Sequence, residues 1–177
     1  VGLTSYQAIV TLGRMQKGQS ILIHAGSGGI GTFAIQFAKH LGLHVTTTTS
    51  TGNIELVKSL GADTVIDYRT TRFEDACSDM DMVFDTLGGE TLKKSFQVVK
   101  KGGVVVSITA TPDAKTGARY NANAILRGLL HLMNSGLRSL SRKTGVRYEY
   151  LMMEPNGKQL EEIADLAEKK IIRPVVD

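Results

Sequence analysis

Three glycines in this chain stand at a spacing that can bind a phosphate group. Gly26, Gly28 and Gly31 fit the pattern G-x-G-x-x-G. The first glycine allows a tight turn, the second lets the backbone approach a diphosphate, and the third lets a helix pack closely on a strand. A helix starting there would offer unpaired N–H groups and positive dipole potential to the phosphates. The spacing predicts a dinucleotide-binding turn; a tight turn without a ligand is the alternative.

The segments around the glycines have the character that this turn requires. Residues 20–24 are short, apolar and β-branched, which is typical of a buried strand. Residues 29–41 carry apolar side chains at helical spacing and stop before Gly42, a residue type favoured after a helix. The sequence therefore predicts a strand, a glycine turn and a helix in immediate succession.

The same alternation continues along the chain and predicts the fold class. Strands are expected at 44–49, 64–68, 82–85, 104–108 and 146–152, and an extended segment at 171–176. Helices are expected at 4–12, 54–60, 91–100, 122–133 and 157–170, with Asn53 as a candidate N-cap and the pair at 102–103 ending the third. This order predicts an α/β chain with one domain, residues 1–177. Its sheet would be doubly wound and mostly parallel, a Rossmann fold of three αβα layers.

Length and composition bound the class of protein. The 177 residues are 42% hydrophobic and 21% charged, as in soluble globular domains. The single cysteine, Cys77, excludes an internal disulfide and a multi-cysteine zinc site within these residues. No apolar run is long enough to span a bilayer, so we expect a cytoplasmic protein without a membrane partner. Because the chain starts at Val1, we expect it to be a fragment of a longer protein.

Positive charge is concentrated in one segment. The net charge is +4, but residues 114–148 contain no acidic side chain. Their basic residues could serve nucleic acid or an anionic ligand. A solvated or subunit-facing surface is favoured, since aromatic side chains are not interleaved with the charges, and we expect no nucleic-acid partner. The basic residues are Lys115, Arg119, Arg127, Arg138, Arg142, Lys143 and Arg147.

The end of the second predicted strand indicates which dinucleotide fits. An acidic residue about 20 positions beyond the glycines usually holds the ribose 2′-hydroxyl of NAD. Residues 48–53 contain no acid, and their hydroxyls and amide can donate to a 2′-phosphate. This favours NADP(H), with Ser50 and Asn53 as donors and Tyr68 entering from the next strand end. Alternatively, Ser50 shapes a turn, Asn53 caps a helix and Tyr68 is an ordinary strand residue.

No residue of this chain is predicted to catalyse a reaction or bind a metal. The four histidines have no ligand spacing, and no tyrosine is followed four residues later by lysine. His24 and His40 are interpreted as structural. Asp85, at a predicted strand end, is interpreted as a hydrogen-bonded structural carboxylate. Cys77 has no activating neighbours, since the only charged residues near it in the sequence are acidic, and it is interpreted as inert.

Several motifs together resemble a known family. They lie at residues 2–8, 24–31, 60–63, 66–68 and 84–89, and from 155–157 through 172–175. In this order they resemble the cofactor domain of a medium-chain dehydrogenase/reductase, in the zinc-independent quinone oxidoreductase branch. Relatives often carry lysine where Asn53 stands.

The resemblance implies an activity and a set of cofactor contacts. Such enzymes bind NADPH between this domain and a separate catalytic domain, and they transfer hydride to a quinone or an α,β-unsaturated carbonyl. This chain would then bind a small-molecule substrate only with a missing catalytic domain. Thr4, otherwise a candidate helix N-cap, would lie near the nicotinamide. The other implied contacts are Ser27, Gly28, Gly29 and Ile30 at the pyrophosphate, Leu87 and Gly88 beside the cofactor, and Ile108, Thr109 and Ala110 at the nicotinamide end.

Two other functions remain open at this point. The chain could be the enoyl-reductase part of a polyketide or fatty-acid synthase, which shares these motifs. It could also be a non-catalytic NADPH-binding interaction module that uses its basic segment. Pairing through the strand at 146–152 could give a homodimer.

Overall fold

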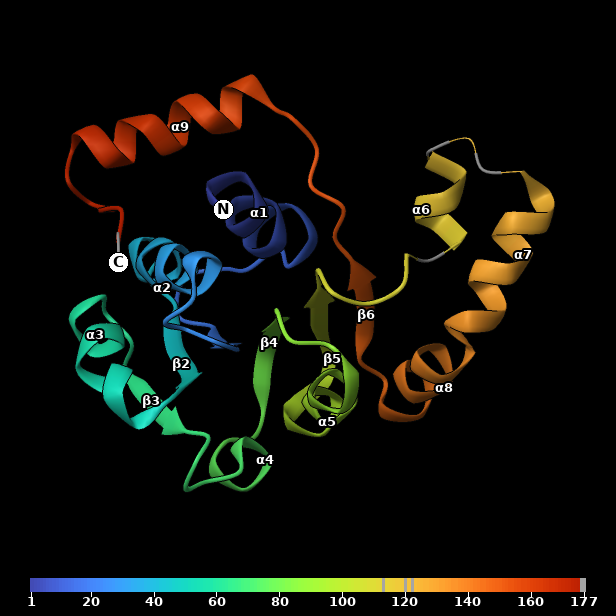
Figure 1. Cartoon of the computed structure of the whole chain (residues 1–177), viewed down its shortest axis with the longest axis horizontal. Helices are drawn as coiled ribbons and strands as arrows, with labels where there is room; N and C mark the ends of the chain where they lie inside the picture. Colours follow the sequence, from blue (N-terminus) through green and yellow to red (C-terminus); the bar gives the residue numbers. More distant parts are fainter. Residues whose placement is uncertain (113, 120, 122, 176–177) are drawn as a thin grey trace.

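A parallel sheet forms the centre of the chain (Figure 1) in the computed structural model, which describes residues 1–112, 114–119, 121 and 123–175. Within these residues six strands lie in the order β3-β2-β1-β4-β5-β6, and each neighbouring pair is parallel. The strands are β1 (Ser20–Ile23), β2 (His44–Thr49), β3 (Thr64–Asp67), β4 (Met80–Asp85), β5 (Val99–Ser107) and β6 (Arg147–Tyr150). From β1 the strands are added first toward one edge of the sheet (β2, β3) and then toward the other (β4, β5, β6). Doubly wound sheets open a crevice for ligands at this switch point, between β1 and β4.

Helices cover both faces of the sheet, as the predicted three-layer Rossmann fold requires. One face carries η1 (Gln7–Leu12), α2 (Gly29–His40) and α3 (Ile54–Ser59), and the other carries α4 (Phe73–Ala76), α5 (Gly89–Val98) and α8 (Ser135–Thr144). The remaining helical elements are α1 (Gly2–Tyr6), η2 (Thr51–Asn53), α6 (Ala114–Arg119), α7 (Ala124–Met133) and α9 (Gly157–Glu168).

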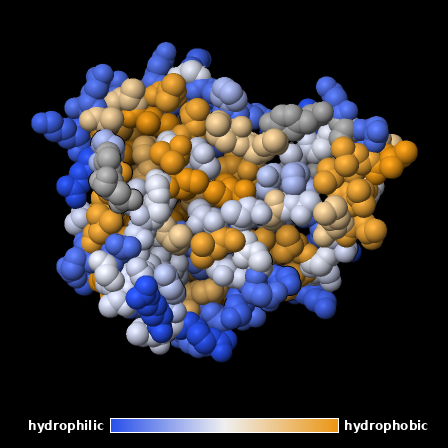
Figure 2. Space-filling view, in the orientation of Figure 1, coloured by the Kyte–Doolittle hydropathy of each residue, from blue (hydrophilic) through white to orange (hydrophobic). Residues whose placement is uncertain are grey.

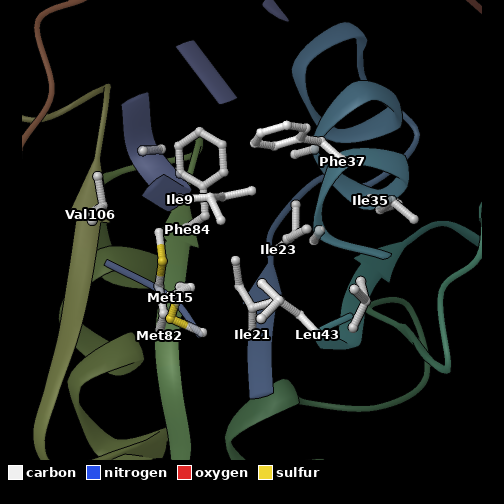
Figure 3. Close-up of a cluster of buried hydrophobic side chains, with 14 of the residues drawn as sticks. Ile9, Met15, Ile21, Ile23, Ile35, Phe37, Leu43, Met82, Phe84 and Val106 are labelled. Carbon is white, nitrogen blue, oxygen red and sulfur yellow. The ribbon is translucent and has the colours of Figure 1, made fainter. Parts of the chain in front are cut away.

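Alternate strand residues supply two hydrophobic cores. Ile21 and Ile23 of β1 face the first core, with Phe37 of α2, whereas Leu22 faces the second, with Phe96 of α5 (Figure 3 shows the first core). This separation follows from the twofold repeat of a strand, which sends successive side chains to opposite faces. Both faces of β1 are therefore buried, and the loop at its carboxyl end has a rigid base.

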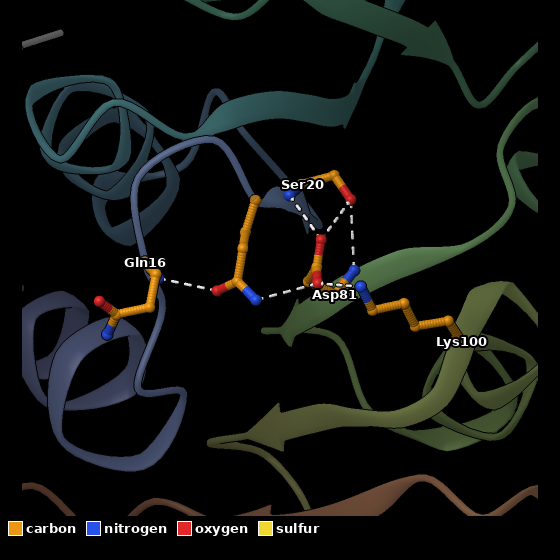
Figure 4. Close-up of polar contacts among 5 residues, drawn as sticks. Gln16, Ser20, Asp81 and Lys100 are labelled. Carbon is orange, nitrogen blue, oxygen red and sulfur yellow. Dashed lines mark hydrogen bonds and ion pairs between the residues drawn. The ribbon is translucent and has the colours of Figure 1, made fainter.

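Asp81 joins the amino-terminal ends of three strands, at the end of the sheet opposite the glycine turn. Its carboxylate accepts from the Ser20 N–H at 2.9 Å, from Gln19 Nε2 at 3.1 Å and from the Lys100 ammonium at 2.5 Å (Figure 4). Burial opposes ionisation, but Lys100 and Ser20 outweigh it and hold the pKa of Asp81 below its usual range. The starts of β1, β4 and β5 are thereby joined far from the glycine turn.

Several predicted boundaries are wrong. The helix expected at 4–12 is split into α1 and the π-helix η1. The glycines at 102–103 do not end a helix, because β5 already starts at Val99 and passes through them. Gly103 lies so close to β4 that an added Cβ would be 2.7 Å from the Asp81 carbonyl oxygen. The helix α8 was not expected, since its serines and glycine are typical of loops.

The helix expected at 122–133 is α7, with Ala122 outside the described residues. None of its residues is buried, and Ile125 is 84% exposed. An apolar group at the right of Figure 2 lies over this helix, in the region where Figure 1 labels α7.

Two basic residues of the segment 114–148 form ion pairs. Arg119 pairs with Glu154 at 3.0 Å and Arg147 with Glu149 at 3.7 Å. Among the helices that the structure describes, none is long and apolar enough to cross a bilayer.

Candidate functional site

The glycine turn joins β1 to α2 as the spacing predicts, and two of its glycines are required by packing. An added Cβ at Gly26 would collide with the Thr47 hydroxyl, and one at Gly31 would collide with the Ala25 carbonyl oxygen and lie 2.6 Å from the Gly26 Cα. Ala25 itself has a left-handed φ of 53°. The turn is therefore tight because helix and strand backbones are in contact, as the motif requires.

Gly28 differs from its two partners because the protein leaves room beside it. Apart from its neighbours in the chain, the described residues place only the Ala25 carbonyl oxygen within 4 Å of an added Cβ there, at 3.3 Å. Its φ of −75° and ψ of 165° are open to any residue type. Packing thus explains Gly26 and Gly31 but not Gly28, which is exposed to solvent together with Gly29.

The start of α2 is suited to an anion. Within the described residues no side chain caps this helix and no acid stands in its first turn. The first N–H groups of a helix have no partner inside it, and the dipole makes this end positive. The 12-residue helix therefore directs donors and positive potential toward the space beside Gly28.

Hydroxyls and one amide meet at the carboxyl ends of β1 and β2. The Asn53 amide donates to Ser27 Oγ at 3.2 Å and to Ser50 Oγ at 3.3 Å, and Thr49 Oγ1 donates to Ser27 Oγ at 3.0 Å. Asn53 occupies the N-cap position of α3, but its side chain makes no cap hydrogen bond, so the alternative of a capping Asn53 is wrong. The structure brings Ser27, Ser50 and Asn53 into one cluster.

These bonds decide what the Ser27 hydroxyl can still do. A serine oxygen has two lone pairs, and Asn53 and Thr49 donate to both. The Ser27 O–H therefore remains as a donor, which suits a ligand oxygen that carries no hydrogen. The side chain of Asn53 orients two hydroxyls and is itself occupied by them.

The next strand end contributes Tyr68 and an acid that the sequence analysis missed. Tyr68 directly follows β3 and is 61% exposed. Asp67 Oδ2 accepts from the Thr51 hydroxyl at 2.5 Å, and Asp67 Oδ1 accepts from the Arg69 N–H at 3.0 Å. The Thr51 hydroxyl and then the Arg69 N–H hold the pKa of Asp67 below its usual range. A carboxylate therefore lies close to the predicted 2′-phosphate donors, with the backbone of Arg69 beside it.

On the other side of β1, a buried carboxylate organises the loops after β4 and β5. Asp85 is fully buried and accepts from the Gly88 N–H at 3.0 and 3.1 Å, from the Leu87 N–H at 3.3 Å and from Ser107 Oγ at 2.7 Å. It also accepts from Thr109 Oγ1 at 3.3 Å. The interpretation of Asp85 as a hydrogen-bonded structural carboxylate is confirmed. Five residues predicted to line the cofactor lie on these two loops: Leu87, Gly88, Ile108, Thr109 and Ala110.

Thr4 lies on a helix outside the sheet. It lies inside α1 and Val1 holds the N-cap position, so the alternative of Thr4 as a helix cap is wrong. Ser5, its neighbour, is buried and its hydroxyl donates to the Ile30 carbonyl oxygen at 3.5 Å. The contact places α1 beside the start of α2, where Ile30 is half-buried.

Neither His24 nor Cys77 is equipped for chemistry. His24 is buried, and its ring nitrogens contact Thr48 Oγ1 at 3.2 Å and Ser95 Oγ at 3.1 Å. Burial lowers the pKa of His24 to about 4, so its imidazole is neutral near pH 7. Burial raises the pKa of the Cys77 thiol to about 11, which keeps it protonated. In the described part of the chain, no three His, Cys, Asp or Glu side chains form a group that could hold a metal.

Comparison with known proteins gives a consistent group of relatives. A family profile described as zinc-binding dehydrogenase matches residues 60–177. The chain is 33% identical to "NAD(P)H oxidoreductase RTN4IP1, mitochondrial" of Danio rerio, over 100% of this chain and 48% of that protein. It is 46% identical to 2-methylene-furan-3-one reductase of Solanum lycopersicum, over 75% of this chain and 34% of that reductase. The chain therefore spans about half or less of these relatives' length.

Solved structures share the fold. The quinone oxidoreductase from Coxiella burnetii superposes with a TM-score of 0.81 at 28% identity, over 99% of this chain and 49% of that chain. The CurK enoyl reductase superposes with a TM-score of 0.77 at 22% identity, over 98% of this chain and 51% of that one. The second likeness supports the fold alone. Both superpositions cover about half of the longer chain.

Proposed function

Because the chain belongs to the zinc-binding dehydrogenase family of the medium-chain dehydrogenase/reductase superfamily, we propose that it is the NADPH-binding part of a reductase. The reductase would transfer hydride to a quinone or to an α,β-unsaturated carbonyl. This class of substrate comes from the names of the relatives, which include a quinone oxidoreductase and a trans-enoyl reductase of Aspergillus terreus. The described residues offer no zinc ligand set, so no step is assigned to a metal.

One observation carries the proposal, namely the open space beside Gly28 at the start of α2. The fold does not require glycine there, but a diphosphate must approach the backbone at that point. The unpaired N–H groups of the first helical turn would then hold the phosphate oxygens. Ser27 adds a hydroxyl whose oxygen already accepts two hydrogen bonds, so that its hydrogen remains to be donated to a phosphate oxygen.

NADPH, when bound, supplies the hydride, and this chain supplies binding and orientation. The glycine turn and the start of α2 would hold the diphosphate of the dinucleotide. The loops held by Asp85 would limit where the nicotinamide half can lie, and Thr4 of α1 is proposed to contact that half. Placing the reacting carbon correctly is itself a large part of catalysis, so these contacts suffice for the role proposed for this chain.

The cluster around Asn53 supports a preference for NADPH over NADH. A phosphate oxygen is an acceptor and fits hydroxyls that are left with a hydrogen to donate. Ser50 is held in this state by the Asn53 amide, whereas Ser27, which the same amide orients, is assigned to the diphosphate. Asp67 opposes this preference by its charge, but its two oxygens already accept from Thr51 and the Arg69 backbone.

We expect the chain to bind NADPH more tightly than NADH, and Asn53→Asp to reverse this order. The new carboxylate would repel the 2′-phosphate and accept from a free 2′-hydroxyl, which should weaken NADPH binding about tenfold or more. Titration monitored by nucleotide fluorescence would measure both dissociation constants. Asn156→Asp is the matched control, because it introduces the same charge at the exposed N-cap position of another helix, α9. A tighter NADH complex in the unchanged chain would contradict the assignment.

We also expect the chain by itself to show no turnover of quinones or enones with NADPH. It spans about half of its relatives, and none of its residues has been assigned a proton-donating role. The measurement is NADPH oxidation in a sample whose nucleotide binding has been verified. Turnover that disappears in a variant with a bulky residue at position 28 would place catalytic groups within this chain.

A part of a synthase is a second candidate, because 39% identity over 116 residues links the chain to mycoketide-CoA synthase of Mycobacterium tuberculosis. That match covers 61% of this chain and 3% of the synthase. Carrier or ketoreductase domains in the flanking sequence would favour it. A cytoplasmic location, a homodimer formed through β6 and a non-catalytic binding role remain predictions.

A further inference from the structure

The loops at the carboxyl ends of β4 and β5 share a single anchor. Asp85 Oδ2 accepts from the Gly88 N–H, from Ser107 Oγ and from Thr109 Oγ1, at 3.1, 2.7 and 3.3 Å. Its other oxygen accepts from the N–H groups of Leu87 and Gly88, at 3.3 and 3.0 Å. One carboxylate thus receives four donor groups from two loops that come from different strands.

Two further contacts restrict the positions that these two loops can take. Gly88 has a φ of 74°, and an added Cβ would lie 2.8 Å from Thr109 Oγ1. The Ile108 N–H donates to the Asp85 carbonyl oxygen at 3.3 Å, so the main chain of Asp85 holds the β5 loop as well. A small displacement of the carboxylate would therefore move both loops at once.

The burial of this carboxylate is costly for the fold and calls for an explanation. Asp85 and Ser107 are both fully buried. Neutral N–H and O–H donors only partly offset the cost of burying a carboxylate. Replacing a buried polar pair by two apolar side chains of the same shape often leaves the stability of a fold unchanged. What the carboxylate provides is a fixed relation between two loops, and both of them face the half of the crevice on the β4 and β5 side of β1.

We infer that Asp85 is a positioning residue for the nicotinamide half of the cofactor, acting through the loops at 86–88 and 108–110. This inference rests on the proposed function. It predicts an effect that is confined to one half of the nucleotide. The adenosine half is assigned to Ser27 and Ser50, at the carboxyl ends of β1 and β2. Among the described residues, neither of them is hydrogen-bonded to a group that donates to Asp85.

The test compares two ligands and three variants of the chain. NADPH fills both halves of the crevice, whereas adenosine 2′,5′-bisphosphate fills only the adenosine half. Ser107→Ala removes the shortest hydrogen bond to Asp85, at 2.7 Å. Asp85→Asn replaces one accepting oxygen by an NH2 group, which cannot accept the hydrogen bonds that converge there. Ser95→Ala is the matched control, because Ser95 is a fully buried serine that contacts His24 instead of Asp85.

We expect Ser107→Ala to weaken NADPH binding about fivefold and Asp85→Asn about tenfold or more. Binding of adenosine 2′,5′-bisphosphate should stay within about twofold in both variants, as should both ligands in Ser95→Ala. Should Asp85→Asn fail to fold, Ser107→Ala still decides the question, because it leaves the carboxylate in place.

Two results would overturn the inference while the unchanged chain binds both ligands. One is unaltered NADPH affinity in Ser107→Ala, and the other is an equal loss of both ligands, which would indicate general loosening of the fold. If the unchanged chain binds neither nucleotide, the proposed function fails and this inference fails with it.

Discussion

Gly31→Ala is expected to destabilise the fold strongly, whereas Gly28→Val should leave the fold almost intact and abolish tight nucleotide binding. At Gly31 the added methyl group would collide with the Ala25 carbonyl oxygen and stand 2.6 Å from the Gly26 Cα. These are backbone atoms of a turn between a buried strand and a helix, so they cannot move aside. Overpacking of this kind costs about 1–3 kcal/mol or more, against about 1 kcal/mol gained from the helix propensity of alanine.

At Gly28 the balance is different: apart from the chain neighbours, the described residues place only the Ala25 carbonyl oxygen within 4 Å of an added Cβ, at 3.3 Å. The backbone angles suit valine, and the loss of glycine at the N-cap position costs at most about 1 kcal/mol. The side chain would instead occupy the approach of the diphosphate. We expect NADPH affinity to fall about a hundredfold, which corresponds to about 2.7 kcal/mol.

Urea unfolding followed by circular dichroism, together with NADPH titration, would separate the two effects. Gly31→Ala should lower the unfolding free energy more than Gly28→Val does, and Gly28→Val should lower NADPH affinity while the unfolding transition is kept. Unchanged NADPH affinity in a folded Gly28→Val variant would reject the pose of the diphosphate on which the proposed function depends.

The glycine turn could be predicted from sequence because its determinants are local. Gly26, Gly28 and Gly31 lie within six positions, and the strand and helix beside them have unambiguous periodicity. The same holds for β2, whose predicted bounds agree with the structure. Spacing alone could not separate the glycines required by packing from the one that leaves room for a ligand. That distinction depends on Thr47 of the neighbouring strand at Gly26, and on the folded backbone of the turn at Gly31.

Contacts between different strand ends could not be predicted, because they depend on register. Asp67 was overlooked since it stands far along the chain from the glycines, but the parallel pairing of β2 and β3 sets Asp67 opposite Thr49. Asn53 was expected to donate to a ligand or to cap a helix. Its side chain makes no cap bond and orients Ser27 and Ser50, an arrangement that spacing did not indicate. Asp67 could have been found by aligning the carboxyl ends of the predicted strands, which places it next to the end of the strand at 44–49.

The early start of β5 shows how tertiary contacts override local signals. Two glycines and two lysines at 100–103 indicate a helix end followed by a loop. In the fold this stretch is already part of the strand, because Val99 pairs with Met80 across an irregular register. Position 103 requires glycine because the Asp81 carbonyl oxygen lies close to its backbone, and not because the chain turns there.

Acidification is expected to weaken the fold through His24. Burial lowers the pKa of this imidazole to about 4 from an ordinary 6.5, although the carboxylates of Asp85 and Glu74 act in the opposite direction. Between these two pH values the unfolded chain binds a proton that the folded chain excludes, so stability falls as the pH is lowered through 6.5 and continues to fall until about 4. The fold should lose about 1.4 kcal/mol between about pH 7.5 and pH 5.5 from this group alone.

His24→Gln tests the assignment, since glutamine offers an amide to Thr48 and Ser95 but does not titrate. Unfolding free energies measured across this interval should depend less on pH in the variant, even if the variant is less stable at neutral pH. The comparison stays above pH 5 because carboxylates with lowered pKa values, such as Asp81, contribute to acid unfolding only below their ordinary range. An equal pH dependence in both proteins would mean that His24 takes up its proton in the folded state, and hence that the base of the glycine turn is more open to water than its burial indicates.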